Sequence, residues 1–185
     1  GDKPDVDLLV SGIRAAIQGS SDVLTDEEML GILGAHQAVA EAKAQEDAIA
    51  SMAENLKVGQ AYLEGNKDRA GIKVLPSGVQ YRELEPGDGP RPTMEDTVLA
   101  HYVGRYVDGE EFEGTYEADE PIYFPLKRVI PGWQEVVQLM PVGAKWEVTV
   151  PAALAYGEKG TPDIEPNSVL IFEMELLGIK GKTID

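Results

Sequence analysis

The residues able to do covalent chemistry are few and scattered. The chain has no cysteine and two histidines, His36 and His101, which are far apart in the sequence. Thiol catalysis, disulfides and cysteine-ligated metals are therefore excluded, and two isolated histidines do not make a metal site. The adjacent Glu110 and Glu111 follow a turn signal, where solvent exposure is the simpler expectation. The glycine-rich stretches match neither phosphate-binding nor dinucleotide-binding patterns. We predict no metal and no cofactor.

Aromatic and aliphatic residues are instead concentrated between Tyr102 and Phe172. A pocket of such side chains can bind an apolar group and remove water from it. For any single aromatic residue, however, packing in the core is an adequate explanation. Phe172, for example, alternates with Glu173 as a core residue of a strand would. The aromatic residues by themselves leave both interpretations open.

The elements that would position these residues form an antiparallel sheet with one short helix. Alternating apolar and polar residues predict strands that are buried on one face. Asp108-Gly109 predicts a hairpin turn, and Pro131 suits the first turn of a helix over residues 132–140. The predicted strands are Val79–Leu84, Thr97–Val107, Lys145–Val150 and Val169–Ile179.

The first 75 residues follow a different pattern. Only Pro4 precedes residue 76, and the segment is rich in helix-forming residues. A short helix is predicted over Val6–Ile17, and Thr25 with Glu28 forms a capping box before a helix that continues to about Gly65. About 40 residues would give a rod of roughly 60 Å. Glycines 31, 34 and 59 are expected to bend or break it. Two interpretations remain: a small helical bundle, or a protruding stalk that pairs with a second copy.

Composition limits the partners. A net charge of −17 opposes binding to nucleic acid and to anionic membrane surfaces. A hydrophobic content of 43% is enough to fill a core, and no run is long enough to span a bilayer. No signal peptide is recognisable.

Three segments resemble one known family. VIPGWQEVVQLMPVGAKWEVTVPAALAYGEKG (residues 129–160), HYVGRYVDGEEFE (101–113) and PNSVLIFEMELLGI (166–179) resemble FKBP-type peptidyl-prolyl cis/trans isomerases, in the family's order and spacing. DVDLLVSGIRAAIQG and YLEGNKDRAGIKVLPSGVQY resemble the arm of the bacterial macrophage-infectivity-potentiator class. The resemblance implies an α+β fold: a helical dimerisation or stalk domain over 1–75, and over 76–185 a half-open antiparallel sheet wrapped on one short helix.

The resemblance also implies a site. Trp133 corresponds to the pocket floor, Tyr156 to the hydroxyl that binds the ligand carbonyl, and Ile130 to a backbone N–H donor. The implied catalytic residues are Tyr102, Phe112, Glu113, Trp133, Tyr156 and Phe172; the implied substrate-binding residues are Phe124, Val129, Ile130 and Ile164.

Two departures from the family pattern concern the pocket rim. Glu113 replaces the usual Asp, and Ala118 replaces an Arg that pairs with it in the family. We therefore expect weaker binding of macrolides such as rapamycin. Acidic residues near the pocket are also expected to ring it with negative charge, against the alternative of a solvated acidic surface; these are Glu117, Asp119, Glu120, Asp163 and Glu165.

The resemblance leaves three functions to compare. The first is proline isomerisation in unfolded or nascent polypeptides, the second a chaperone that holds clients between two arms, and the third a binding module without strong activity. A homodimer is implied. The periplasm is the implied compartment, with the cytoplasm or an outer-membrane association as alternatives.

Overall fold

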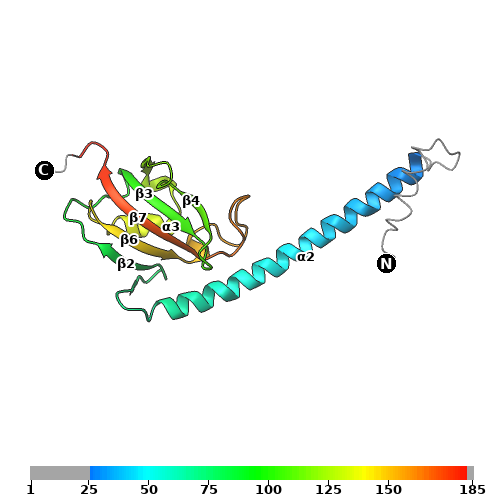
Figure 1. Ribbon diagram of the computed structural model, residues 1–185, viewed down its shortest axis with the longest axis horizontal. Helices are drawn as coiled ribbons and strands as arrows, with labels where there is room; N and C mark the ends of the chain where they lie inside the picture. The colour runs from blue at the N-terminus through cyan, green and yellow to red at the C-terminus, as the bar shows by residue number, and fades with distance from the viewer. Residues whose placement is uncertain (1–25, 183–185) are drawn as a thin grey trace. The chain divides into compact units, whose positions relative to one another are not determined.

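The computed structural model describes residues 26–182 (Figure 1). The predicted helix over Val6–Ile17 and the Thr25 capping residue lie outside this range. The chain divides into two compact units, which meet between Ala50 and Ser51. The predicted domain boundary at residues 75 and 76 instead marks the change from helical to strand composition, and it stays a prediction.

Helix α2 spans Asp26–Asn66 as one continuous α-helix of 41 residues. The expectation that its glycines break it is therefore wrong. Gly59 has a different role: a Cβ added there would lie 2.6 Å from Val169 Cγ2. The absence of a side chain lets the helix backbone approach Val169 closely. Over residues 26–182, no helix combines the length and the apolar character needed to cross a bilayer.

The second unit is built on an antiparallel sheet in the order β1-β2-β6-β7-β3-β4, with β5 also paired to β3. The long strands match the predicted ones to within a residue or two at most ends. The element bounds are β1 Lys73–Val74, β2 Gln80–Glu85, β3 Thr97–Arg105, β4 Glu111–Gly114, β5 Ile122–Pro125, β6 Lys145–Val150 and β7 Leu170–Ile179.

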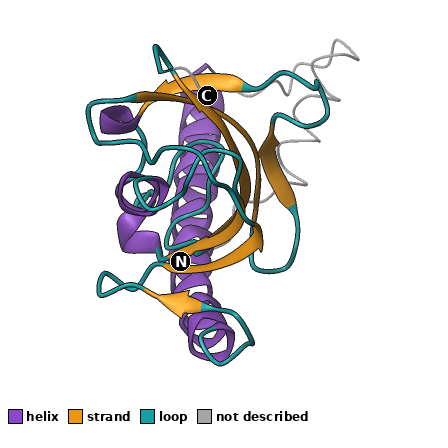
Figure 2. Cartoon of the chain, turned by 90° about the vertical axis from the view of Figure 1, so that its left-hand side faces the viewer, coloured by secondary structure: helices purple, strands orange, loops and turns teal. Residues whose placement is uncertain are grey.

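One short helix fills the inner face of this sheet. Helix α3, Pro131–Val137, begins with Pro131 at its first position and buries Trp133, Val136 and Val137. The sheet curls around it (Figure 2). Two short 3₁₀ helices complete the fold, η1 at Leu126–Arg128 and η2 at Ala152–Leu154. The predicted half-open sheet wrapped on one helix is confirmed.

The outer face of the sheet is less exposed than its alternation predicts. Thr149 was expected to face solvent but is only 1% exposed. The last turn of α2 covers it: Asn66 Nδ2 donates to Gln80 Oε1 at 2.8 Å and to Thr149 Oγ1 at 3.4 Å. Gln80 Nε2 in turn donates to the Leu63 carbonyl at 2.9 Å. A polar residue thus became buried because another element supplies its hydrogen bond.

The Asp108-Gly109 turn is present as predicted. Gly109 has a φ of 94°, which glycine adopts without steric cost. The Tyr106 amide donates to the Glu110 carbonyl at 2.9 Å, and Asp108 Oδ1 accepts from the Glu110 amide at 3.0 Å. The turn ends β3 and starts the approach to β4.

Candidate active site

An open cavity of about 270 Å³ lies at the edge of the sheet beside the start of α3. Strands β3, β5 and β7, the segment around η1 and the turn after η2 all contribute to it. Eight of the ten predicted site residues line it. Its lining consists of Tyr102, Glu113, Ile122, Phe124, Arg128, Val129, Ile130, Trp133, Tyr156 and Phe172.

Trp133 forms the aromatic centre of this cavity. Its ring meets Tyr102 and Phe172 nearly edge to face, with centroids 5.0 Å apart in both pairs and interplanar angles of 84° and 83°. Phe124 lies 5.2 Å away at 51°. Aromatic pairs favour such tilted arrangements, and these three contacts fix the indole on three sides. Its remaining face is available to the cavity, although the residue is only 6% exposed.

The Trp133 indole N–H is buried and has no hydrogen-bond partner among residues 30–182. Buried donors are usually satisfied, so an unpaired one at a cavity is uncommon. It gives the floor a polar atom that no protein group uses.

The backbone leading into α3 forms one wall. The Ile130 carbonyl accepts from the Trp133 and Gln134 amides at 3.0 and 3.1 Å, which ties the wall to the first turn. Gln134 Nε2 donates to the Val129 carbonyl at 2.8 Å. Within the part of the chain that the structure describes, the Ile130 N–H donates to no protein acceptor.

Phe112 and Ile164 lie beside the cavity rather than in it. Both line an adjoining space of about 400 Å³ that shares Glu113 and Tyr156 with the first. Phe112 meets Phe172 edge to face at 5.9 Å. A Cβ at Gly104 would lie 2.5 Å from the Phe112 ring, so glycine there lets the ring lie against β3.

The polar groups of the site include two phenols and a carboxylate. Burial raises the pKa of Tyr102, and the Glu113 carboxylate raises it further. Burial, then the Glu113 charge, also raises the pKa of Tyr156. Both hydroxyls therefore stay protonated at neutral pH and available as donors. Glu113 and Tyr102 both line the cavity, and the expected hydrogen bond between them stays a prediction.

Sequence reasoning missed two lining residues, Ile122 and Arg128. Ile122 was detectable, since it stands two positions before Phe124 in β5 and so shares its face of the strand. Arg128 gave no signal, because its position at the end of η1 depends on the turn into α3.

The expected acidic ring is not what the cavity presents. Glu165 points to a different cavity, where its carboxylate accepts from Asn55. Asp163 lines the adjoining space rather than the main cavity. Asp119 is absent from the lining of both spaces. The charged groups of the main cavity are Glu113 and Arg128.

The fold and the cavity define a class of protein: a half-open sheet wrapped on one helix, whose tryptophan forms the floor of an aromatic cavity. Comparison with family models gives the same class. Residues 89–177 match the FKBP-type peptidyl-prolyl cis-trans isomerase model, and residues 1–82 match the domain amino terminal to FKBP-type peptidyl-prolyl isomerase. The chain therefore belongs to the FKBP-type peptidyl-prolyl cis-trans isomerases.

Individual relatives match along most of the chain. The outer membrane protein MIP of Legionella longbeachae is 42% identical over 176 residues, covering 94% of this chain and 75% of that protein. The isomerase FkpA of Aeromonas hydrophila is 40% identical over 189 residues, covering 100% and 69%. The crystal structure of FkpA from Escherichia coli matches with a TM-score of 0.84 and 38% identity, covering 97% of this chain and 84% of that one. The similarity includes the helical segment as well as the sheet.

Proposed function

We propose that the cavity over Trp133 is where the protein isomerises peptide bonds that precede proline. The observation that carries this is an indole held on three sides by Tyr102, Phe124 and Phe172, with its open face at the cavity. A flat apolar floor suits the proline ring. The wall formed by Val129 and Ile130 then holds the residue in place on one side.

The mechanism requires no covalent step. Rotation about the bond faces a barrier of about 18–20 kcal/mol because amide resonance keeps it planar. Water on the carbonyl stabilises that planar state. A site that removes this water and fits the twisted amide favours the transition state over the ground state. Each 1.4 kcal/mol or so of that preference gives about tenfold in rate.

Two donors can replace the lost water. Tyr156 and Ile130 both line the cavity, and over residues 26–182 neither the Tyr156 hydroxyl nor the Ile130 N–H donates to a protein acceptor. Donors fixed in advance stabilise a twisted carbonyl without reorganisation. Glu113 lines the cavity with Tyr102, and we propose that its carboxylate acts through that phenol, whose pKa it raises.

The test compares the two tryptophans of the chain. Trp133→Ala removes the floor, and we expect kcat/KM in a protease-coupled proline-peptide assay to fall by tenfold or more, on the order of 1.4 kcal/mol or above. Trp146→Phe is the matched control, because Trp146 stacks on Tyr81 and lines no part of this cavity. Full activity of a folded Trp133→Ala would falsify the assignment.

We also propose weaker macrolide binding than in typical family members. The Glu113 carboxylate stands one methylene further from the backbone than the usual aspartate, and Ala118 supplies no charged partner. Calorimetric titration with rapamycin measures this; nanomolar affinity contradicts it.

A second function, chaperone activity, is favoured by helix α2. Its apolar side chains are exposed in the single chain, including Leu30 at 71% and Ile49 at 60%. Such a surface suits either a second copy or an unfolded client. We propose a homodimer acting in the periplasm or at the outer membrane; the names of the relatives support the latter setting. Suppression of aggregation by the whole chain, but not by residues 51–185, tests the chaperone.

A further inference from the structure

The loop of residues 157–167, between η2 and β7, carries Ile164 to the edge of the isomerase site. Ile164 is 5% exposed and lines the adjoining space with Phe112 and Tyr156. Hydrogen bonds within the loop shape its tip: the Thr161 amide donates to the Ile164 carbonyl at 2.9 Å, and Thr161 Oγ1 accepts from the Ile164 amide at 3.0 Å. These bonds define the turn but do not attach it to the rest of the domain.

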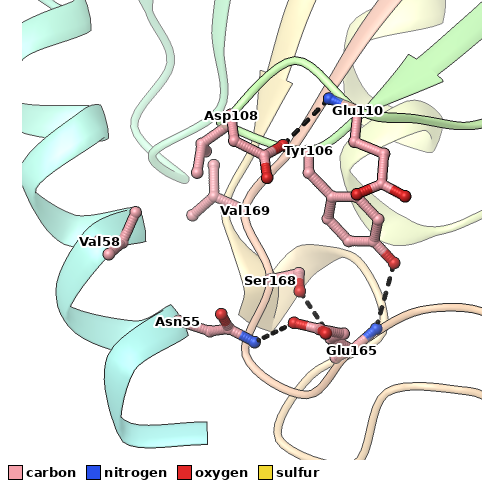
Figure 3. A pocket seen from close by; sticks show the side chains of 9 residues that line it. Asn55, Val58, Tyr106, Asp108, Glu110, Glu165, Ser168 and Val169 are labelled. Atoms are coloured by element: carbon pink, nitrogen blue, oxygen red, sulfur yellow. Dashed lines mark hydrogen bonds between the residues drawn. The ribbon is translucent and has the colours of Figure 1, made fainter. Parts of the chain in front are cut away.

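Helix α2 attaches the loop from one side (Figure 3). Asn55 Nδ2 donates to Glu165 Oε2 at 2.9 Å and to the Pro166 carbonyl at 3.0 Å. One turn earlier, the Met52 carbonyl accepts from Asn167 Nδ2 at 3.2 Å. Residues 51–66 of the helix belong to the same compact unit as the sheet, so these contacts are internal to that unit.

Tyr106, just after the end of β3, holds the same loop from the other side. Its hydroxyl donates to the Asp163 carbonyl at 3.1 Å and accepts from the Glu165 amide at 3.3 Å. Its ring packs on Phe112 at 5.2 Å. The residues on both sides of Ile164 are therefore fixed, one by Tyr106 alone and the other by Tyr106 and Asn55.

The Asn55 contact matters because of the charges around Glu165. Glu165 lines a cavity of about 330 Å³ together with Asp108 and Glu110 (Figure 3). Without a donor, the repulsion among three carboxylates favours withdrawal of Glu165, and with it the neighbouring Ile164. The amide of Asn55 supplies that donor.

We infer that Asn55 is a positioning residue for the isomerase: by holding Glu165 and Pro166 it keeps Ile164 in place at the substrate pocket. A loop fixed in advance costs less entropy on binding, so the effect falls on KM rather than on the rotation step. This inference rests on the proposed location of the isomerase site.

The experiment uses the full chain and peptides that extend beyond proline. Asn55→Ala removes both hydrogen bonds and is expected to raise KM about three- to tenfold, with kcat and the melting temperature little changed. Lys57→Ala is the matched control, since that side chain lies on the same turn and is 79% exposed. Its KM should stay at the wild-type value.

A double variant tests the route through Ile164. If Asn55 acts by placing Ile164, adding Asn55→Ala to Ile164→Ala raises KM little further, because both changes remove one contact. The inference is overturned if the KM increase of the double variant is the product of the increases of the two single variants. It is also overturned if Asn55→Ala alone leaves KM unchanged. Failure of the site itself looks different: Ile164→Ala and Trp133→Ala then both leave KM and kcat unchanged.

The reversed pair gives an independent check. Asn55→Asp alone should raise KM more than Asn55→Ala, because it adds a fourth carboxylate to the cavity lined by Asp108, Glu110 and Glu165. Adding Glu165→Gln exchanges the roles: the new glutamine amide can donate to the new aspartate carboxylate at position 55. The double variant should therefore return KM part of the way to the wild-type value. Absence of any recovery overturns the inference.

Discussion

At the scale of single residues, the site combines an uncharged aromatic floor with two charged side chains at its lining, Glu113 and Arg128. Both side chains are exposed; Glu113 raises the pKa of Tyr102 and of Tyr156, whereas Arg128 has no such role among the described contacts. Arg128 is the positively charged residue of this lining, in a protein whose net charge is −17. Such local charge acts on which peptide approaches.

Arg128 should set a preference for acidic residues next to proline. We expect Arg128→Gln to lower kcat/KM for peptides with glutamate beside the apolar-Pro pair by about two- to fivefold at low salt, and to leave lysine peptides unchanged or faster. The control is Lys127→Gln, because Lys127 pairs with Glu95 and lies outside the cavity lining. The prediction is contradicted if Arg128→Gln leaves the preference for glutamate over lysine peptides unchanged, or if that preference persists at high salt.

At the scale of elements, Gly59 decides how closely α2 packs on the sheet domain. In an exposed helix position, alanine in place of glycine stabilises by up to about 1 kcal/mol. At Gly59 alanine should destabilise the protein instead, because the new Cβ would lie 2.6 Å from Val169 Cγ2. We expect Gly59→Ala to lower the free energy of unfolding by about 1–3 kcal/mol, as overpacking does.

Gly65 supplies the matched control for that prediction. It lies in the same helix with nothing within 4 Å of an added Cβ. Denaturant unfolding of both alanine variants separates the cases: Gly65→Ala should be neutral or stabilising. A stabilised Gly59→Ala would show that Val169 moves aside at no cost.

The Asp96–Lys182 ion pair joins the turn before β3 to the segment after β7 at 2.8 Å. Hydrogen bonds from Lys182 and Thr93 lower the pKa of Asp96 from 3.8 to about 2. A carboxyl group whose pKa is lower in the folded than in the unfolded protein stabilises the fold at pH values above its unfolded-state pKa. That stabilisation is lost as the pH falls through its folded-state pKa. Asp96→Asn should therefore be less stable than wild type at pH 7, with the difference fading between about pH 4 and 2. Unfolding at several pH values measures this, and a difference that does not depend on pH contradicts it.

The sequence predicted the elements of the sheet better than the contacts between them. Alternation located β6 and β7, and the Asp108-Gly109 pair located the hairpin, because both signals are local. The burial of Thr149 and the contact of Asn55 with Glu165 join positions more than 80 residues apart, and no local pattern records such a contact. The cavity residues were found through resemblance rather than periodicity, since a core phenylalanine and a pocket phenylalanine alternate in the same way.

At the scale of the whole molecule, the exposed apolar positions of α2 bear on self-association. Leu33, Val39 and Leu56 are 52%, 50% and 46% exposed along one continuous helix. We expect sedimentation equilibrium of the 20.0 kDa chain to give a species of twice that mass. Replacing Leu30 and Leu33 by glutamate should shift it to the monomer, with activity on short peptides retained. A monomer in the unaltered chain sinks this prediction.

The place of β7 in the sheet has a consequence for how the protein is made. It is the last strand of the described chain, yet it pairs with both β6 and β3, and β3 lies about 75 residues earlier. Until β7 has left the ribosome, β3 and β6 have no common partner, so the sheet cannot close before its last described strand is available. Folding waits for contacts of large sequence separation, which form slowly and leave apolar strands exposed in the meantime. This FKBP-type isomerase therefore has a late and vulnerable folding step of its own.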